Sequence, residues 1–211
     1  LDNHLRGFGG SDSLVGYDGD DYLEGGDGND GLLGGPGADT LDGGPGFDGA
    51  VYSDAPGPVT VNLATGRSSG ADGQDVLIDI EVIYGSAFYD LLIGNALAPT
   101  AANPFDMNYF NGGLGNDTLI GGGGYDLAAY SYAGAAVYVD LAEGFATGGA
   151  GNDVLQDIDG VEGTRYNDTI IGNDADNVLY GYSYSEGYLV YNADGDDYLD
   201  GAGGSDQIGG G

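Results

Sequence analysis

Apolar residues recur at every ninth position through the first quarter of the chain, separated by stretches rich in glycine and aspartate. Leu14, Leu23, Leu32 and Leu41 each stand between two variable residues, which is the pattern of a very short strand with one buried face. The six residues before each of these strands carry glycine at the first and fourth positions and aspartate at the sixth. The pattern therefore predicts nine-residue units, each a tight loop followed by a three-residue strand.

The residue types in these loops indicate metal chemistry. Glycine at the first, second and fourth positions predicts positive φ angles and a close approach of neighbouring backbones, which exposes carbonyl groups. Aspartate at the sixth position adds an anionic oxygen, and calcium takes six to eight oxygen ligands of this mixed kind at about 2.3–2.6 Å. The first series of these aspartates is Asp12, Asp21, Asp30, Asp39 and Asp48.

The chain also contains a tandem duplication that is longer than the nine-residue period. Residues 34–95 align without a gap with residues 112–173, at an offset of 78 residues. The chain also begins inside a unit and ends on glycines with no closing cap, whereas solenoids need atypical terminal units. We therefore expect residues 1–211 to form a single elongated domain that is a fragment of a longer protein.

Each copy contains two interruptions of the frame. An 18-residue stretch, residues 52–69 or 130–147, lacks the glycine and aspartate pattern, and a six-residue segment, residues 79–84 or 157–162, follows one unit later. Because eighteen residues equal two units, we expect the coil to continue through the long stretches. The length of the chain then predicts roughly 11–12 coils of 18 residues. At the six-residue segments we expect a local change in the coil, either a kink or a flanking strand.

The charge of the chain excludes several classes of partner. The formal charge is −32, from 35 acidic residues against three arginines. Such a chain does not neutralise a phosphate backbone, so we expect no nucleic-acid partner. Direct membrane insertion is also excluded, because no apolar run approaches the roughly 20 residues of a membrane span. Divalent cations that cancel the carboxylates would instead turn metal binding into folding free energy.

Composition also argues against catalysis. Cysteine is absent, and the only imidazole is His4 in the first unit, which leaves no material for nucleophilic triads or for zinc. The repeat already accounts for nearly all of the well-placed aspartates, so we expect no enzymatic activity in this chain. The lack of cysteine fits any compartment, but loops of this type need millimolar calcium, which favours secretion.

The nonapeptides GYDGDDYLE, GGDGNDGLL, GGPGADTLD and GGPGFDGAV resemble the calcium-binding repeats of the repeats-in-toxin (RTX) family, also called hemolysin-type repeats. The interruptions YSDAPGPVTVNLATG and DIEVIYGSAFYDLLIGN resemble linkers in adenylate cyclase toxin-like RTX proteins. The resemblance implies an all-β fold, a right-handed parallel β-roll with two nonapeptides per coil. It also implies several calcium ions, export from a Gram-negative bacterium by type I secretion, and folding outside the cell.

Carried onto this chain, the resemblance places ions between Asp12 and Asp30, between Asp21 and Asp39, and between Asp30 and Asp48. The residues expected to line metal sites are Asp12, Gly16, Asp18, Asp21, Gly25, Asp27, Gly28, Asp30, Gly34, Gly37, Asp39, Gly43, Gly46, Asp48, Asp75, Asp90, Gly112, Gly115, Asp117, Asp126, Asp153, Asp168, Asp197 and Asp206.

Some units depart from the pattern. Phe88 and Tyr166 stand where the fourth glycine is expected, and residues 94–102 carry Leu97 and Pro99 at the fourth and sixth positions, so we expect no calcium in residues 94–102. Other residues replace the sixth-position aspartate in three units: Asn108, Asn177 and Glu186.

Two classes of function remain open. In the first, the chain is a calcium-dependent folding and stability module of a secreted enzyme, toxin or surface protein. In the second, it is a module that binds extracellular polysaccharide or assembles with like modules at the cell surface. A tyrosine-rich segment bears on the second class, because an aromatic platform suits sugar rings, although tyrosine is also a good strand former. Its tyrosines include Tyr182, Tyr184, Tyr188 and Tyr191.

Overall fold

The computed structural model describes residues 1–96, 107–181 and 195–210. These residues form β-strands, turns and loops without any helix, so the described part holds no helix able to cross a membrane. Most strands have three residues and lie at the seventh to ninth positions of a unit, as β4 (Gly31–Leu33) and β5 (Thr40–Asp42) do. The expectations of an all-β fold and of strands in the last third of each unit are confirmed.

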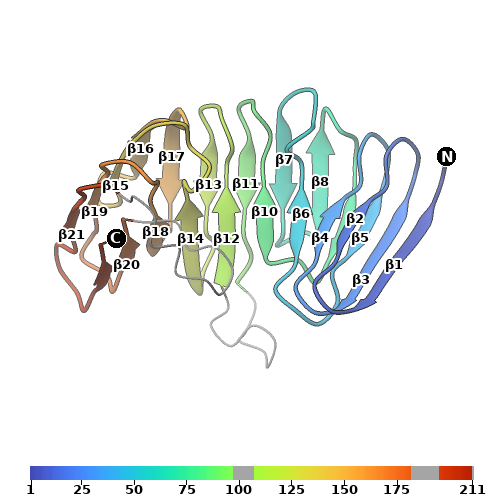
Figure 1. Ribbon diagram of the computed structural model, residues 1–211, viewed down its shortest axis with the longest axis horizontal. Coiled ribbons are helices and arrows are strands. Elements are labelled where there is room, and N and C mark those ends of the chain that lie inside the picture. Colours follow the sequence, from blue (N-terminus) through green and yellow to red (C-terminus); the bar gives the residue numbers. More distant parts are fainter. Residues whose placement is uncertain (97–106, 182–194, 211) are drawn as a thin grey trace.

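The strands form two long sheets that run side by side from the N-terminal to the C-terminal end of the molecule (Figure 1). The first sheet contains, in spatial order, β1 (His4–Gly9), β3 (Tyr22–Asp27), β5, β9 (Val76–Ile78), β8 (Arg67–Gly70), β7 (Val59–Asn62), β11 (Leu91–Ile93), β13 (Thr118–Ile120), β17 (Asn152–Gln156), β16 (Phe145–Gly148), β15 (Val137–Asp140), β19 (Thr169–Ile171) and β21 (Tyr198–Asp200).

The second sheet pairs its strands in parallel throughout. In spatial order it contains β2 (Ser13–Val15), β4, β6 (Gly49–Val51), β10 (Val82–Tyr84), β12 (Met107–Asn111), β14 (Tyr125–Ala129), β18 (Gly160–Glu162), β20 (Val178–Tyr180) and β22 (Gln207–Gly209). In the regular units the chain alternates between the sheets, and each strand pairs with the strand 18 residues later, as Leu23 does with Leu41. This is a parallel β-roll with two nonapeptides per coil.

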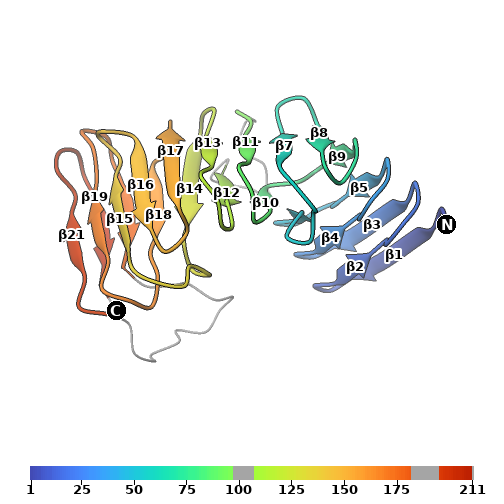
Figure 2. The same ribbon diagram turned by 90° about the horizontal axis from the view of Figure 1, so that it is seen from above.

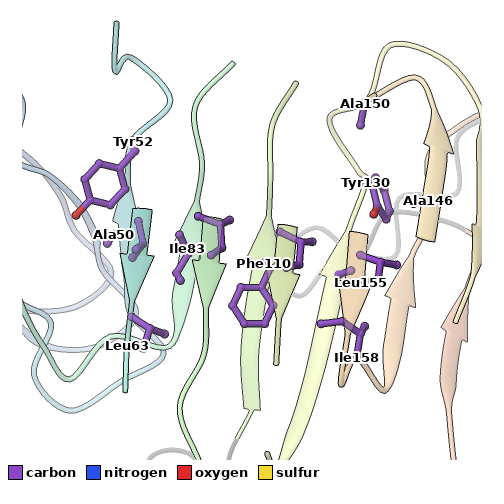
Figure 3. Packing of buried hydrophobic residues seen from close by; sticks show 14 of the residues in the cluster. Ala50, Tyr52, Leu63, Ile83, Phe110, Tyr130, Ala146, Ala150, Leu155 and Ile158 are labelled. Carbon is purple, nitrogen blue, oxygen red and sulfur yellow. The ribbon is translucent and has the colours of Figure 1, made fainter. Parts of the chain in front are cut away.

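The core fills the space between the two sheets. Leu23, Leu32 and Leu41, all at eighth positions, are fully buried, whereas Leu14 in the first coil is only partly buried. Figure 3 shows how the core continues along the roll through side chains such as Ile83 and Phe110, which are also fully buried. Stacking of eighth-position side chains from successive coils therefore supplies the hydrophobic burial that single units lack.

The two 18-residue stretches do not continue the coil, and that expectation is wrong. In the first copy β7 pairs antiparallel with β8, and β8 pairs antiparallel with β9, so the stretch folds as a hairpin within the first sheet. The second copy repeats this with β15, β16 and β17. In Figure 2, β7, β8 and β9 lie on one side of the roll and β10 on the other.

The hairpins change the number of coils. The second sheet has nine strands within the described residues, fewer than the roughly 11–12 coils expected from the length of the chain, because each hairpin uses 18 residues without adding a strand to that sheet. The alternation of Val59, Val61 and Leu63, followed by a turn at Gly66, is the local signal that indicates this hairpin.

The six-residue segments form strands inside the second sheet. β10 pairs in parallel with β6 and with β12, and β18 pairs in parallel with β14 and with β20. In each copy a connection of only three residues, 79–81 or 157–159, crosses from the first sheet to the second. The expected residues Tyr182, Tyr184, Glu186, Tyr188 and Tyr191, and most of residues 94–102, lie outside the described residues.

Candidate metal sites between stacked loops

The sixth-position aspartates point into the roll. Asp21, Asp30, Asp39 and Asp48 are at most 4% exposed, although each is an ionisable side chain in a chain with three arginines. Charged groups of this kind stay buried only when they are paired, hydrogen-bonded or bound to a metal. Their surroundings therefore decide what these loops do.

One carboxylate oxygen of each aspartate binds the loop of the preceding coil. The amide of Asp12 donates to Oδ1 of Asp30 at 2.8 Å, and the amide of Asp30 donates to Oδ1 of Asp48 at 2.7 Å. This row of aspartates, which we call the first ladder, precedes the strands of the second sheet. A second ladder precedes the first sheet, where the amide of Asp21 donates to Oδ1 of Asp39 at 2.8 Å.

The other carboxylate oxygen has no donor. Several Oδ2 atoms are buried and make no hydrogen bond, which leaves a negatively charged acceptor facing the space between two loops. An unpaired buried acceptor of this kind costs free energy unless another group satisfies it. The atoms belong to Asp12, Asp21, Asp30, Asp39, Asp48 and Asp117.

Backbone carbonyls face the same space, beside the first glycine of each loop. A Cβ on Gly16 would lie 2.5 Å from Oδ2 of Asp21 and 2.6 Å from the carbonyl oxygen of Gly34. The first-position glycines Gly70 and Gly148 have φ values of 148° and 129°, whereas Gly16, Gly25, Gly34, Gly43 and Gly112 have no positive φ, so that part of the expectation is wrong for them. Glycine is needed here because the carboxylate and the next carbonyl leave no room for a side chain. The same crowding by a carboxylate and a carbonyl is found at Gly25 and Gly43, and the aspartate carboxylate of the same loop crowds Gly34 and Gly112.

The fourth glycine brings successive loops together. Gly28 has a φ of 141°, and a Cβ on it would overlap the carbonyl oxygen of Gly10 in the preceding coil. At the second position Phe8 and Tyr17 adopt φ values of 74° and 69°, so glycine is not obligatory there. Fourth-position glycines crowded by a carbonyl from the preceding coil include Gly37, Gly46 and Gly115.

These carboxylate and carbonyl oxygens are suitable ligands for a hard cation. The described residues hold no group of three or more acidic or histidine side chains of the kind that forms a compact metal site. The spaces beside Gly7, Gly16 and Gly25 instead combine a buried carboxylate oxygen with a backbone carbonyl from the next coil. Calcium accepts such mixed oxygen ligands, whereas zinc prefers nitrogen and sulfur.

Burial also changes the acid–base behaviour of the ladders. Desolvation raises the pKa of Asp39 to about 6 and the pKa of Asp48 to about 6, and neighbouring aspartates add to both shifts. In the second copy, burial raises the pKa of Asp117 to about 8. These carboxylates are therefore costly to ionise without a cation beside them.

Two of the expected ligands are satisfied by the protein itself. Both carboxylate oxygens of Asp90 accept the Ser86 hydroxyl, at 2.8 and 3.0 Å, and Oδ2 also accepts the Ser86 amide at 2.6 Å. Asp168 is held in the same way by the amide and hydroxyl of Thr164. These two loops lack the fourth glycine. In them a serine or threonine donates hydrogen bonds to the aspartate, whereas in the regular units one carboxylate oxygen of the aspartate has no hydrogen-bond donor.

Asp75, a further expected ligand, is satisfied in a second way. Its Oδ2 atom accepts hydrogen bonds from the Ser68 hydroxyl at 2.6 Å and the Tyr52 hydroxyl at 3.0 Å. Both donors come from the 18-residue stretch that forms the hairpin. The 18-residue stretch thus supplies two hydroxyl groups to a ladder carboxylate. The carboxylate of Asp75 therefore has side-chain hydrogen-bond donors within the protein.

The remaining expected residues divide by location. Asp18 and Asp27, at third positions, have exposed side chains on the outside of the loops. Four others continue the ladders, because Oδ1 of each accepts the amide of a sixth-position residue in the preceding coil; they are Asp126, Asp153, Asp197 and Asp206.

Sequence reasoning missed the fifth position. Oδ1 of Asn29 accepts the amide of Phe47 at 3.2 Å, and Oδ1 of Asp20 accepts the amide of Ala38 at 2.9 Å. These bonds run in the direction opposite to those of the ladders, so each loop is tied to the next coil by its fifth residue as well. Asparagine or aspartate at several fifth positions is the sequence signal for this contact.

The family model of the RTX calcium-binding nonapeptide repeat, which spans four copies of the repeat, matches residues 6–41, 15–49, 108–128, 145–157 and 156–183. The chain carries RTX calcium-binding repeats. The matches cover just under half of the sequence and include the loops of Asp12, Asp21, Asp30 and Asp39, whose Oδ2 atoms lack donors. The RTX repeats indicate that this chain binds calcium. No curated protein matches the sequence.

Proposed function

We propose that this chain is a non-catalytic calcium-binding RTX module of a secreted bacterial protein, and that it folds and is stabilised when calcium binds. One observation carries the proposal: buried carboxylate oxygens in successive loops have no donor and face carbonyls of the next coil. We assign the ions to the spaces between Asp12 and Asp30, between Asp21 and Asp39, and between Asp30 and Asp48. We expect the loops of Asp90 and Asp168 to bind calcium less tightly than these three, because hydroxyl groups already donate hydrogen bonds to their carboxylates.

The charge of the chain supports folding on calcium. Thirty-five acidic residues face three arginines, and one of these, Arg6, pairs with Glu24 at 2.9 Å. Repulsion among the ladder carboxylates opposes stacking of the coils when no cation is present. An ion that binds only the stacked loops adds its binding free energy to folding, so several such sites make the transition steep.

The same chemistry supports a location outside the cell. RTX repeats are typical of secreted bacterial proteins, and their loops need calcium at extracellular concentrations. In our proposal the chain stays expanded in calcium-poor cytosol, leaves by a type I secretion system and folds on reaching calcium outside. The linker segments resemble those of adenylate cyclase toxin-like proteins, which supports a place between repeat blocks of a larger protein.

Chelation and titration test this proposal. The chain is stripped with a chelator, then titrated with calcium while far-UV circular dichroism and hydrodynamic radius are recorded. We expect an expanded chain that becomes compact and β-rich in one steep step. Magnesium is the control, because it demands tighter octahedral geometry and sheds water reluctantly. A compact β signal that persists in excess chelator contradicts the proposal, and equal potency of magnesium contradicts calcium selectivity.

The alternative function is binding of extracellular polysaccharide or assembly with like modules. One group of described aromatic rings favours it: Tyr132 is 76% exposed and its ring centroid lies 6.5 Å from that of Tyr84, which lies 6.5 Å from Tyr109. A tyrosine ring combines an apolar face with a polar hydroxyl group, which suits stacking on a sugar ring. A glycan array probed in calcium tests it, and loss of any signal in Tyr132→Ala identifies this cluster as the binding surface.

A further inference from the structure

The three-residue connections of each copy lie where a six-residue loop stacks elsewhere. Asp79, Ile80 and Glu81 lead from β9 to β10. In the stack of the first ladder they come next after the loop that contains Asp48. They carry no glycine and no nonapeptide pattern. The amides of Glu81 and Val82 nevertheless donate to the carbonyl of Asp48, at 3.0 and 2.9 Å, as the amide of Gly31 does to the carbonyl of Asp12 at 2.9 Å.

Asp79 supplies the carbonyl that a regular loop takes from its first glycine. In a regular pair, the carbonyl oxygen of Gly43 lies beside the α-carbon of Gly25, next to Oδ2 of Asp30. At the next step of the ladder, the carbonyl oxygen of Asp79 takes this place beside Gly43. Asp79 has a φ of 48°, a left-handed conformation that non-glycine residues rarely adopt.

Glu81 supplies the carboxylate of the missing sixth position. Its Oε2 atom accepts the amide of Asp48 at 3.0 Å, which is the bond that Asp30 makes with Asp12 at 2.8 Å. The first ladder therefore continues through Glu81 although the connection is three residues shorter. A glutamate takes the structural role of the repeat aspartate at this step.

The space between these segments holds an unsatisfied charge. Asp48 is fully buried, and its Oδ2 atom has no hydrogen-bond partner. A Cβ on Gly43 would lie 2.8 Å from this Oδ2 atom, and it would lie closer still to the carbonyl oxygen of Asp79. An unpaired carboxylate oxygen and a carbonyl thus meet beside Gly43. A second carboxylate accepts the amide of Asp48, and among the described residues no cationic side chain pairs with these groups.

We infer that the connection 79–81 completes a further calcium site with the loop of Asp48, in which Glu81 replaces the sixth-position aspartate and Asp79 contributes its carbonyl. This inference rests on the proposed calcium function of the regular loops. Burial, with Asp48 and Asp79 nearby, raises the pKa of Glu81 to about 7. The ligand class is a hard divalent cation that accepts mixed oxygen donors.

The second copy repeats the arrangement. Oδ2 of Asp159 accepts the amide of Asp126 at 3.0 Å, and the carbonyl of Asp157, whose φ is 52°, lies beside Gly121. The carboxylate at this step is therefore an aspartate in one copy and a glutamate in the other. The tandem duplication thus keeps the same oxygen ligands in both copies, and in the second copy Asp157 and Asp159 also line a cavity of about 530 Å³.

Counting bound ions tests the inference. The full chain and its variants are dialysed against saturating calcium, and bound calcium per chain is measured by elemental analysis. Glu81→Gln keeps the size of the side chain and an acceptor oxygen but removes the charge, so we expect one ion fewer than in the wild type. Glu81→Asp should keep the wild-type number, because Asp159 occupies this place in the second copy. Glu143→Gln, at an exposed position, is the matched control and should also keep it.

The outcomes separate this inference from the proposed function. If the wild type binds several ions and E81Q binds the same number, the further site does not exist although the regular sites do. If the wild type binds none, the proposed function itself fails. Equal losses in E81Q and E143Q also overturn the inference. Should E81Q not fold in saturating calcium, Asp159→Asn gives the same count in the second copy, with loss of one ion expected and no loss refuting it.

Discussion

Replacing Asp30 by asparagine isolates one metal ligand from the hydrogen bonds around it. Asparagine keeps the Oδ1 acceptor that binds the amide of Asp12, and it replaces the buried Oδ2 atom that lacks a donor. Asp27 lies in the same loop with an exposed side chain, so Asp27→Asn makes the same change of charge without touching the inter-loop space. The pair D30N and D27N separates ligand loss from charge loss.

The size of the effect follows from mass action. An ion that binds only the folded form contributes about 2.7 kcal/mol when calcium is 100 times its dissociation constant. Asp30 borders two of the assigned spaces, between Asp12 and Asp30 and between Asp30 and Asp48. Loss of one of these sites in D30N should therefore lower the melting temperature by about 5–10 °C, and loss of both by about 10–20 °C, since 1 kcal/mol corresponds to roughly 2–4 °C for a chain of this size. The deficit should shrink by about 1.4 kcal/mol for each tenfold reduction in calcium.

Thermal melts across a range of calcium concentrations provide the assay. For the wild type and D27N, the melting temperature should rise with the logarithm of calcium along the same line. D30N should follow a shallower line that approaches the other two at low calcium. A D30N deficit that stays constant at all calcium concentrations would show that the residue acts through packing alone, and an equal deficit in D27N would show that overall charge explains the effect.

Three further predictions concern other parts of the roll. Ser86→Ala removes the hydroxyl that holds Asp90 and should cost about 1–3 kcal/mol at every calcium concentration; a calcium-dependent loss, or an equal loss in the exposed control Ser69→Ala, argues against this role. Leu41→Ala empties a fully buried position and should destabilise the calcium-bound chain by about 2–5 kcal/mol in denaturant titrations, and a neutral result would place the core elsewhere. Burial raises the pKa of Asp117 to about 8, so its contribution to apo stability is present at low pH and lost as pH rises through about 8. Calcium must displace that proton, so the titration midpoint should move to higher calcium as pH falls from 8.5 to 6.5, and a constant midpoint contradicts this.

The sequence was most informative where the nine-residue period is regular. The buried leucines at Leu23, Leu32 and Leu41 and the strands around them lie where the period predicts, because a three-residue strand has one choice of inward side chain. The hairpins were missed because frame counting alone does not distinguish a coil from two antiparallel strands of the same total length. The alternation around Val59 and the turn at Gly66 carried that information locally.

The site was predictable in residue type and less so in chemistry. Periodicity identified Asp90 together with Asp30, but a hydroxyl at Ser86 gives Asp90 protein donors, and this contact depends on loop geometry that spacing does not reveal. Periodicity also passed over Glu81, because it lies outside any complete nonapeptide. Its role emerges only when the stacking of Asp48 on the connection is known.

The central claim is that calcium lies between stacked loops, held by the oxygens that the protein leaves without donors. Crystals grown in calcium, with diffraction data collected where calcium scatters anomalously, test this directly. The account predicts anomalous peaks between Asp12 and Asp30, between Asp21 and Asp39, and between Asp30 and Asp48, each within about 2.3–2.6 Å of an Oδ2 atom. Peaks confined to the exposed third-position carboxylates, with none between these loops, would contradict it.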